Sequence, residues 1–202
     1  MKMCLILCSV LFSYALFWAG WYRIPAGPVQ FVDLRKHALT TAADGPIRSL
    51  DQCDHYVVFC ASLADNVHGF PGHCYVCWTR DLSVDLLKCD SLAYMPAKFE
   101  DQIPSLVSKV DGVVISQAAR GNMRNLSKLV VAVDSKTYER SKLVAKQWSP
   151  ENFQVGVKDC VAFTNNVASA VGLRTPNCSF RFPQDYLRDL RDLNRITSWS
   201  RR

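Results

Sequence analysis

The first 22 residues constrain this chain most, because they are too apolar to belong to the surface of a globular domain. From the third to the twenty-second residue there is no charged side chain. An uncharged apolar run of about 20 residues is long enough to cross a bilayer as a helix. Trp18, Trp21 and Tyr22 lie at its far end, where aromatic side chains sit at a membrane interface. We therefore expect residues 1–22 to form an N-terminal hydrophobic helix that anchors the chain in a membrane.

A cleaved signal peptide is the alternative interpretation of the same run. Lys2 would supply its positive start, residues 4–12 its apolar centre, and Ser13-Tyr14-Ala15 a cleavage site between small residues. Cys8, which follows Leu-Ile-Leu, also resembles the acylated cysteine of a lipoprotein. Each interpretation places the domain outside the cytosol, in the periplasm or cell envelope.

Residues 23–52 are expected to be a linker and lead-in to the domain. Pro25 ends the apolar helix close to their start. Arg23, Arg35 and Lys36 are cations of the kind that favours the cytoplasmic side of a membrane. The opposite membrane orientation therefore stays open.

The rest of the chain has the composition of an ordinary globular domain, expected over residues 53–180. Of the 202 residues, 49% are hydrophobic and 21% are charged, which indicates one packed core and no disorder. The net charge is +6, and much of the excess lies in residues 181–202. This basic C-terminal tail either contacts an acidic surface or forms a solvated helix with charge pairs three or four residues apart. The charge does not indicate a nucleic-acid partner, and the sequence does not indicate the oligomeric state.

The apolar pattern of the domain predicts an α+β fold, with a small antiparallel sheet packed against helices. We expect strands where β-branched and aromatic residues concentrate, and helices where apolar residues repeat with helical spacing. The predicted strands are 55–60, 73–79, 84–94, 113–116 and 128–134, and the predicted helices are 100–110, 135–148 and 160–171. The segments 73–79 and 84–94 would form a hairpin around a turn at Arg80-Asp81, and Ser135 would cap the second helix.

The stretch 159–173 carries the clearest helix signal in the chain. Asp159 is a preferred N-cap residue, and Gly172 suits the position after the helix end. The apolar stripe consists of Cys160, Phe163, Val167, Ala170 and Val171. Cys160 is therefore expected in the first turn of a buried helix, where the helix dipole and free backbone N–H groups favour the thiolate.

A nucleophilic thiol needs a base, and His73 is the best candidate. It opens a predicted strand after the loop Gly69-Phe-Pro-Gly72, which would keep a cleft open. A neutral imidazole takes the thiol proton, and a third polar group orients the ring. On the returning strand of the hairpin, Asp90 is the expected third group, with Ser91 as an alternative. Backbone N–H groups at the start of the helix, including that of Cys160, would form the oxyanion hole.

Seven of the nine cysteines lie in the domain. One reactive thiol would leave six that can pair, and an exported domain permits disulfides; Cys77 and Cys89 could meet across the hairpin. A zinc cluster around His73-Cys74-x-x-Cys77 is the alternative. A strand over 73–79 would place Cys74 and Cys77 on opposite faces, where they cannot share one metal. We therefore expect no metal and no cofactor.

Together these signals resemble the circularly permuted branch of the papain-like superfamily, the NlpC type, which includes lecithin–retinol acyltransferase relatives and bacterial envelope proteins. The matching motifs are Gly72-His73 opening a strand, then Asp159-Cys160-x-x-Phe163 opening a helix that ends at Gly172-Leu173-x-x-Pro176. In that branch the histidine precedes the cysteine, the reverse of papain. The resemblance covers about residues 55–176. It implies a thiol hydrolase or acyltransferase acting on amide or ester bonds, with His73 and Cys160 as the matching dyad. The third polar position has no clear match.

Three functions are consistent with the sequence. The first is a cell-envelope cysteine hydrolase that cleaves an amide or peptide bond, with a peptide or peptidoglycan substrate. The second is a lipid acyltransferase or esterase of the same fold, which would need an apolar groove beside Cys160. The third is a catalytically inactive, disulfide-stabilised envelope binding protein, because a cysteine on an apolar stripe is more often a core residue than a nucleophile.

Overall fold

The computed structural model describes residues 30–33, 55–62, 72–82, 89–116 and 126–194. The expected hydrophobic helix at 1–22 lies outside these ranges, as does the end of the chain after residue 194. In the described part, no helix is both long enough and apolar enough to cross a bilayer.

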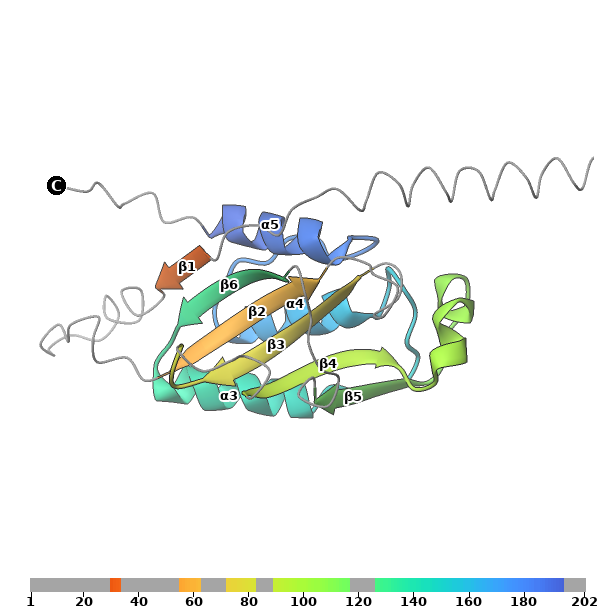
Figure 1. The fold of residues 1–202 in the computed structure, drawn as a ribbon, viewed down its shortest axis with the longest axis horizontal. Coiled ribbons are helices and arrows are strands. Elements are labelled where there is room, and N and C mark those ends of the chain that lie inside the picture. The colour runs from red at the N-terminus through yellow and green to blue at the C-terminus, as the bar shows by residue number, and fades with distance from the viewer. Residues whose placement is uncertain (1–29, 34–54, 63–71, 83–88, 117–125, 195–202) are drawn as a thin grey trace, which may run out of the picture.

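A six-stranded sheet forms the centre of the molecule (Figure 1). Its strands, in spatial order, are β1 (Gln30–Asp33), β6 (Leu126–Ala132), β2 (Tyr56–Ser62), β3 (His73–Thr79), β4 (Asp90–Pro96) and β5 (Gly112–Ser116). β1 runs parallel to β6, and the other neighbours pair antiparallel. The predicted α+β class with an antiparallel sheet is confirmed. One strand was not expected, since β1 lies inside the predicted linker.

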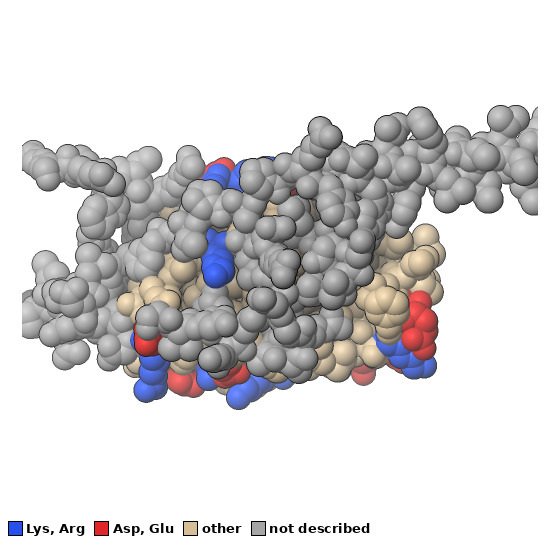
Figure 2. Space-filling model, viewed as in Figure 1, with Lys and Arg blue, Asp and Glu red and all other residues tan. Residues whose placement is uncertain are grey.

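In the described ranges, three α-helices cover one face of the sheet. They are α3 (Ser135–Lys146), α4 (Cys160–Ala170) and α5 (Pro183–Leu193). Helices α3 and α4 pack on each other behind the sheet in Figure 1, with α4 against β3 and β4. Helix α5 packs on the same face of the sheet as α4, against β2 and β6. The lower edge, where α3 lies, carries side chains of both charges (Figure 2).

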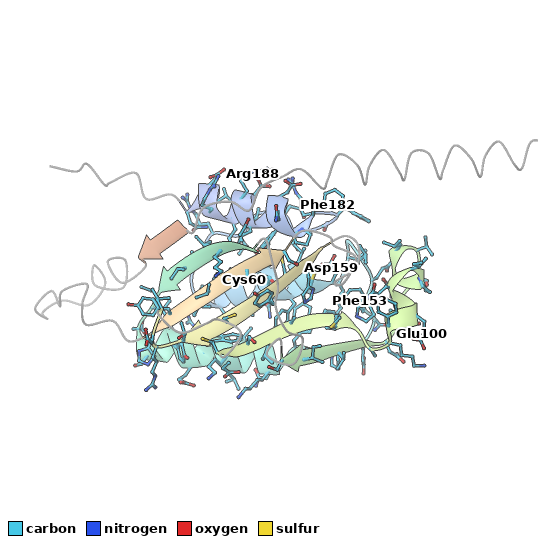
Figure 3. All side chains as sticks on the ribbon, viewed as in Figure 1. Cys60, Glu100, Phe153, Asp159, Phe182 and Arg188 are labelled. Atoms are coloured by element: carbon cyan, nitrogen blue, oxygen red, sulfur yellow. The ribbon has the colours of Figure 1, made fainter. Side chains whose placement is uncertain are left out.

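The central strands are buried on both faces, which explains their nearly continuous apolar sequences. Every residue of β3 is buried. Because side chains alternate along a strand, successive residues of β3 join two different clusters. The cluster on the side of α4 includes Cys74, Val76 and Trp78. The cluster on the opposite face includes Tyr75 and Cys77 from β3, and Val58 and Cys60 (Figure 3) from β2.

The strand predictions at 55–60, 73–79, 113–116 and 128–134 are confirmed to within a few residues by β2, β3, β5 and β6. The predicted helix at 100–110 is wrong. Two short 3-10 helices, η3 (Phe99–Gln102) and η4 (Pro104–Leu106), occupy that segment. Pro104 explains the interruption, since proline has no N–H to donate to the preceding turn.

The N-cap of helix α3 lies one residue earlier than the sequence predicted. Its N-cap is Asp134, whose carboxylate accepts the backbone N–H of Thr137 at 2.8 Å. Ser135, the predicted cap, is instead the first helical residue. The Asp134 carboxylate therefore caps the helix in place of the Ser135 hydroxyl.

Helix α4 follows its sequence signals closely. Asp159 is the N-cap, and one carboxylate oxygen accepts the N–H groups of Val161 and Ala162 at 2.9 and 3.0 Å. Gly172 follows the C-cap with φ of 90°, a conformation that favours glycine. Cys160 is the first residue of the helix, as predicted.

Helix α5 belongs to the folded domain, which therefore extends beyond the predicted boundary at residue 180. Tyr186, Leu187 and Leu190 are buried in the core cluster beside α4. The opposite side of the helix carries ion pairs, including one between Arg188 and Asp185 at 2.7 Å, three residues apart. This part of the basic tail is thus a helix with a solvated charged face.

Candidate functional site

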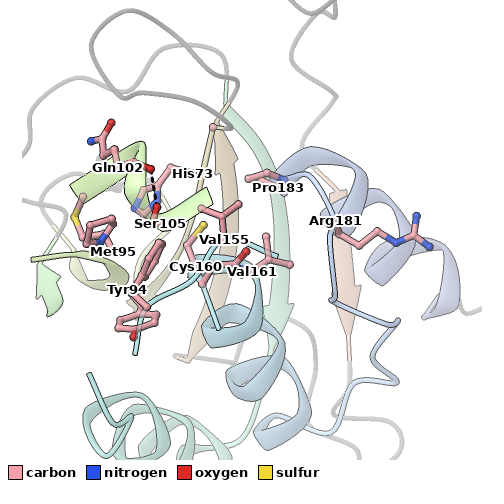
Figure 4. A pocket seen from close by; sticks show the side chains of 14 residues that line it. His73, Tyr94, Met95, Gln102, Ser105, Val155, Cys160, Val161, Arg181 and Pro183 are labelled. Atoms are coloured by element: carbon pink, nitrogen blue, oxygen red, sulfur yellow. Dashed lines mark hydrogen bonds between the residues drawn. The ribbon is translucent and has the colours of Figure 1, made fainter. Parts of the chain in front are cut away.

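The site lies where β3 and β4 separate. These two strands pair over only three residues each, Val76–Trp78 with Asp90–Leu92. Toward the start of β3 they are no longer paired, and a pocket opens at that end (Figure 4). Its lining comes from β3, β4, the η3–η4 segment, the start of α4 and the residues before α5: Gly72, His73, Tyr94, Met95, Pro96, Gln102, Ser105, Phe153, Val155, Asp159, Cys160, Val161, Arg181 and Pro183.

Cys160 enters the pocket from the helix side of the sheet. The first turn of α4 fixes its position, and its side chain is 7% exposed. In Figure 4 the sulfur points away from the body of α4 toward the part of the pocket near His73 and Ser105. Cys160 is therefore a nearly buried thiol with an opening beside it.

His73 reaches the same pocket from β3. It follows Gly72, whose φ of 93° starts the strand with a turn that favours glycine. Its ring stacks on that of Tyr75, with centroids 6.3 Å apart and an interplanar angle of 24°. Alternation along β3 directs His73 to the Tyr75 face, whereas Cys160 belongs to the helix side. Both residues nevertheless line one pocket, at the end of β3 where it is not paired with β4.

Asp90 does not lie beside His73, contrary to the sequence prediction. Its register partner on β3 is Trp78, five residues from His73, which corresponds to about 17 Å along an extended strand. The Asp90 carboxylate instead pairs with Lys142 of α3 at 2.7 Å. Ser91 is opposite Cys77 and equally remote from the start of β3. The strand begins later than predicted, so the hairpin register brings Asp90 to the other end of β3.

Burial dominates the electrostatics of the Cys160 thiol. Burial first and the neighbouring Asp159 carboxylate second raise the pKa of Cys160, which reaches about 12 although backbone N–H groups of Cys74, Cys160 and Val161 lower it. The effect of the helix start, which was expected to favour the thiolate, is therefore not the dominant one at Cys160. The helix start does favour the anion, but desolvation and the capping carboxylate outweigh that effect.

The Asp159 cap reduces the number of backbone N–H groups that could form the predicted oxyanion hole. Asp159 already accepts the N–H groups of Val161 and Ala162, and its second oxygen accepts the Gly156 N–H at 2.6 Å. Burial raises the pKa of Asp159, while these backbone N–H groups lower it. Of the first helical N–H groups, that of Cys160 is the one that the Asp159 carboxylate does not occupy.

Two polar residues of the site were missed in the sequence. Ser105 is fully buried, its hydroxyl donates to the Gln102 carbonyl at 2.6 Å, and its own carbonyl accepts the Val155 N–H at 3.0 Å. Figure 4 shows Gln102 and Ser105 at the same end of the pocket as His73. The interruption at Pro104 was the available signal, because it separates two turns, the second of which buries Ser105.

The described cysteines are free thiols and form two groups. They are Cys60, Cys74, Cys77, Cys89, Cys160 and Cys178. Cys74 lies beside Cys160 on the helix side, and its thiol donates to the Pro183 carbonyl at 3.7 Å. Cys60, Cys77 and Cys89 share the cluster on the opposite face. The predicted proximity of Cys77 and Cys89 is confirmed, without a disulfide between them.

The predicted zinc alternative has no support in the geometry. Cys74 and Cys77 lie on opposite faces of β3, as their spacing in a strand requires. Within the ranges that the structure describes, no group of three or more His, Cys, Asp or Glu side chains has the arrangement of a metal site.

The pocket has a mainly apolar wall with a few polar groups. Its cavity measures about 40 Å³ and is partly open to solvent. The apolar side chains are Tyr94, Met95, Pro96, Phe153, Val155, Val161 and Pro183. Arg181 lies at the side of α5, where it pairs with Asp189 at 3.3 Å. A nearly buried thiol, an imidazole and an apolar wall suit acyl chemistry on a partly apolar substrate.

Comparison with known proteins adds no relative. No protein-family model, no curated protein and no solved structure matches this chain.

Proposed function

We propose that this chain is a cell-envelope cysteine hydrolase that cleaves an amide or peptide bond, with Cys160 as the nucleophile and His73 as the general base. The observation that carries the proposal is that the first residue of α4 and the first residue of β3 line one pocket. Thiol and imidazole are the two groups that a cysteine hydrolase requires, and a partly open pocket gives a carbonyl substrate access to both.

The raised pKa of Cys160 determines how the first step would run. Because the thiol is protonated at neutral pH, the sulfur attacks the carbonyl carbon as its proton passes to the His73 imidazole. The carbon–nitrogen bond of the tetrahedral intermediate then breaks, and the imidazolium returns the proton to the leaving amine. Water releases the acyl group from the resulting thioester. The Cys160 N–H is available to the developing oxyanion, and Gln102 and Ser105 replace Asp90 as candidates for orienting the imidazole.

An activated ester tests the proposal without knowledge of the natural substrate. We expect p-nitrophenyl acetate to acetylate Cys160, with release of p-nitrophenolate and a thioester on the Cys160 peptide by mass spectrometry. Cys160→Ser and His73→Gln should each abolish this adduct, provided that circular dichroism shows a folded protein. Cys178→Ser is the matched control, because Cys178 is the more exposed thiol of this region. Acetylation that survives in His73→Gln, or that falls on Cys178 alone, would contradict the proposal.

A lipid acyltransferase or esterase of the same fold is the second candidate. The apolar lining of the pocket favours it, because Met95, Phe153 and Val155 would contact an acyl chain better than a polar peptide. The two candidates predict different effects of acyl-chain length on the rate of reaction with p-nitrophenyl esters. Preference for p-nitrophenyl esters of long chains over the acetate would support the lipid substrate, and the reverse order would support the amide hydrolase. Absence of a Cys160 adduct with every ester would leave the inactive binding protein as the better account.

A further inference from the structure

Several large apolar side chains are exposed on the segments that also line one end of the pocket. Nine large hydrophobic residues are exposed in the described part of the chain, and six of them lie in three segments beside the site. We call these six the apolar rim: Phe99, Ile103, Leu106, Val107, Val157 and Phe180. Scattered exposed apolar residues need no explanation, but a group of them on one surface indicates a binding surface.

The three segments of the rim are joined side by side. The Val155 N–H donates to the Ser105 carbonyl at 3.0 Å, which joins the segment of Val157 to η4. The Phe180 N–H donates to the Gly156 carbonyl at 2.9 Å, which joins it to the residues before α5. The same segments supply Gln102, Ser105, Val155 and Arg181 to the pocket wall, so the rim and the pocket share one end of the molecule, at the right in Figures 1 and 3.

Phe180 is held outward at a conformational cost. Its φ is 51°, a left-handed conformation that is unfavourable for phenylalanine, and its side chain is 79% exposed. Its ring lies over Gly156, where an added Cβ would come within 2.4 Å of a ring carbon. A strained backbone that presents an aromatic ring to solvent is a feature of functional surfaces. The ring covers Gly156, yet most of the side chain remains exposed.

Three members of the rim have a cation next to them in the sequence: Lys98 before Phe99, Lys158 after Val157, and Arg181 after Phe180. Two of these cations have partners in the fold, since Lys158 donates to the Glu151 carbonyl at 2.9 Å and Arg181 pairs with Asp189 at 3.3 Å. Apolar side chains next to lysine or arginine are typical of proteins that enter the headgroup region, where the cation stays at the phosphates. Glu100 and Asp101 on η3 offset part of this charge, which suits zwitterionic lipid.

We propose that the apolar rim docks onto the surface of a phospholipid bilayer, so that the pocket opens toward the membrane and takes its substrate from there. The apolar run at residues 4–22 supports this occupant, because it would hold the domain at a bilayer at high effective concentration. The inference concerns the pocket of the proposed function, but it does not require that Cys160 be reactive.

Photolabelling of the full chain in phosphatidylcholine vesicles that contain a carbene-generating phosphatidylcholine tests this proposal. We expect lipid adducts on the peptides of η3–η4 and of Phe180, whatever the N-terminal segment shows. The paired substitution Ile103→Glu and Val107→Glu should remove the η3–η4 adducts. Leu143→Glu is the matched control, because Leu143 is 54% exposed on α3, outside the rim, and this variant should label as the wild type does.

Adducts that are absent from the rim, or equally frequent at Leu143, would overturn the docking surface; a protein partner or the N-terminal segment of this chain would then be the occupant. The experiment is repeated in Cys160→Ser to separate the two proposals. Labelling of the rim without any ester reaction at Cys160 defeats only the proposed function. Ester reaction at Cys160 without labelling of the rim defeats only the docking surface.

Discussion

Buried cysteines lie on both faces of β3, but their surroundings differ. On the helix side, Cys74 lies beside Cys160 at a pocket that opens between β3 and β4. On the opposite face, Cys60, Cys77 and Cys89 lie in a packed cluster, and none of them lines that pocket. The thiols of both faces are nearly or fully buried. Burial and residue type therefore do not distinguish Cys160, the proposed nucleophile, from the other thiols, whereas its position beside the separation of two strands does.

The largest expected difference concerns alkylation of the native protein with iodoacetamide. An ordinary thiol has a pKa of about 8.5, so a pKa of about 12 reduces the thiolate of Cys160 at neutral pH by roughly three orders of magnitude. We expect Cys178, which is half-buried, to react first at pH 7, Cys160 later, and the opposite-face trio last. Site-resolved mass spectrometry over time gives the order. Fast labelling of Cys160 at neutral pH would show a preformed thiolate and contradict the electrostatics described above.

The stability of the protein at alkaline pH should also depend on the raised pKa of Cys160. Folding raises the pKa of Cys160, so its stabilising contribution is complete below about pH 8.5, the unfolded value, and is lost as pH rises toward about 12. The loss is on the order of 4 kcal/mol for this group. The free energy of unfolding in urea should therefore fall less steeply between pH 9 and 11 in Cys160→Ser than in the wild type. Parallel curves for the two proteins would argue against a buried, protonated thiol.

Two buried serines, one on each side of the sheet, allow the hydrogen bonding on the two faces to be compared. On the helix side, the Trp78 indole N–H donates to the Ser141 hydroxyl at 2.8 Å, so Ser141→Ala should destabilise the protein by about 1–3 kcal/mol by leaving the indole unpaired. On the other face, the Ser91 hydroxyl has no hydrogen-bond partner among the described residues. Ser91→Ala should be neutral or slightly stabilising.

Urea denaturation of both serine variants measures this contrast directly. Equal losses of stability in Ser141→Ala and Ser91→Ala would show that the two hydroxyls have the same environment. Such a result would contradict the hydrogen bond between β3 and α3.

The smallest expected effect belongs to the cap of α4. Asp159→Asn keeps an oxygen that caps the helix but removes the charge that raises the pKa of Cys160. Stability should change little, while alkylation of Cys160 at pH 8 should become several-fold faster. Measuring both quantities on the same preparation separates capping from electrostatics. A slower reaction, or unchanged reactivity with a large loss of stability, would count against this division of roles.

Local signals in the sequence were sufficient for most of the fold and for the position of Cys160. Asp159 and Gly172 bracket α4 through capping chemistry that depends only on neighbouring residues. The apolar runs of β2 and β3 are similarly local. The same Asp159 could also have indicated the raised thiol pKa, because a carboxylate adjacent to a buried thiol opposes its ionisation.

The orientation of the site depended on interactions that the sequence does not reveal. Asp90 was misplaced because the hairpin register is fixed by where β4 starts, and that start lies beyond the predicted one. Ser105 enters the pocket through a backbone hydrogen bond to Val155, 50 residues away in the chain. The separation of β3 and β4, which lets residues of both faces line one pocket, is likewise a property of the assembled sheet.

The central claim, that His73 activates Cys160, is tested most directly by the pH dependence of Cys160 acetylation by p-nitrophenyl acetate. If the imidazole is the base, the rate should rise and level off in the range where histidines lose their proton, and His73→Gln should remove this plateau. A rate that instead increases tenfold per pH unit toward about 12 in both proteins, as ionisation of an isolated buried thiol requires, would contradict the account.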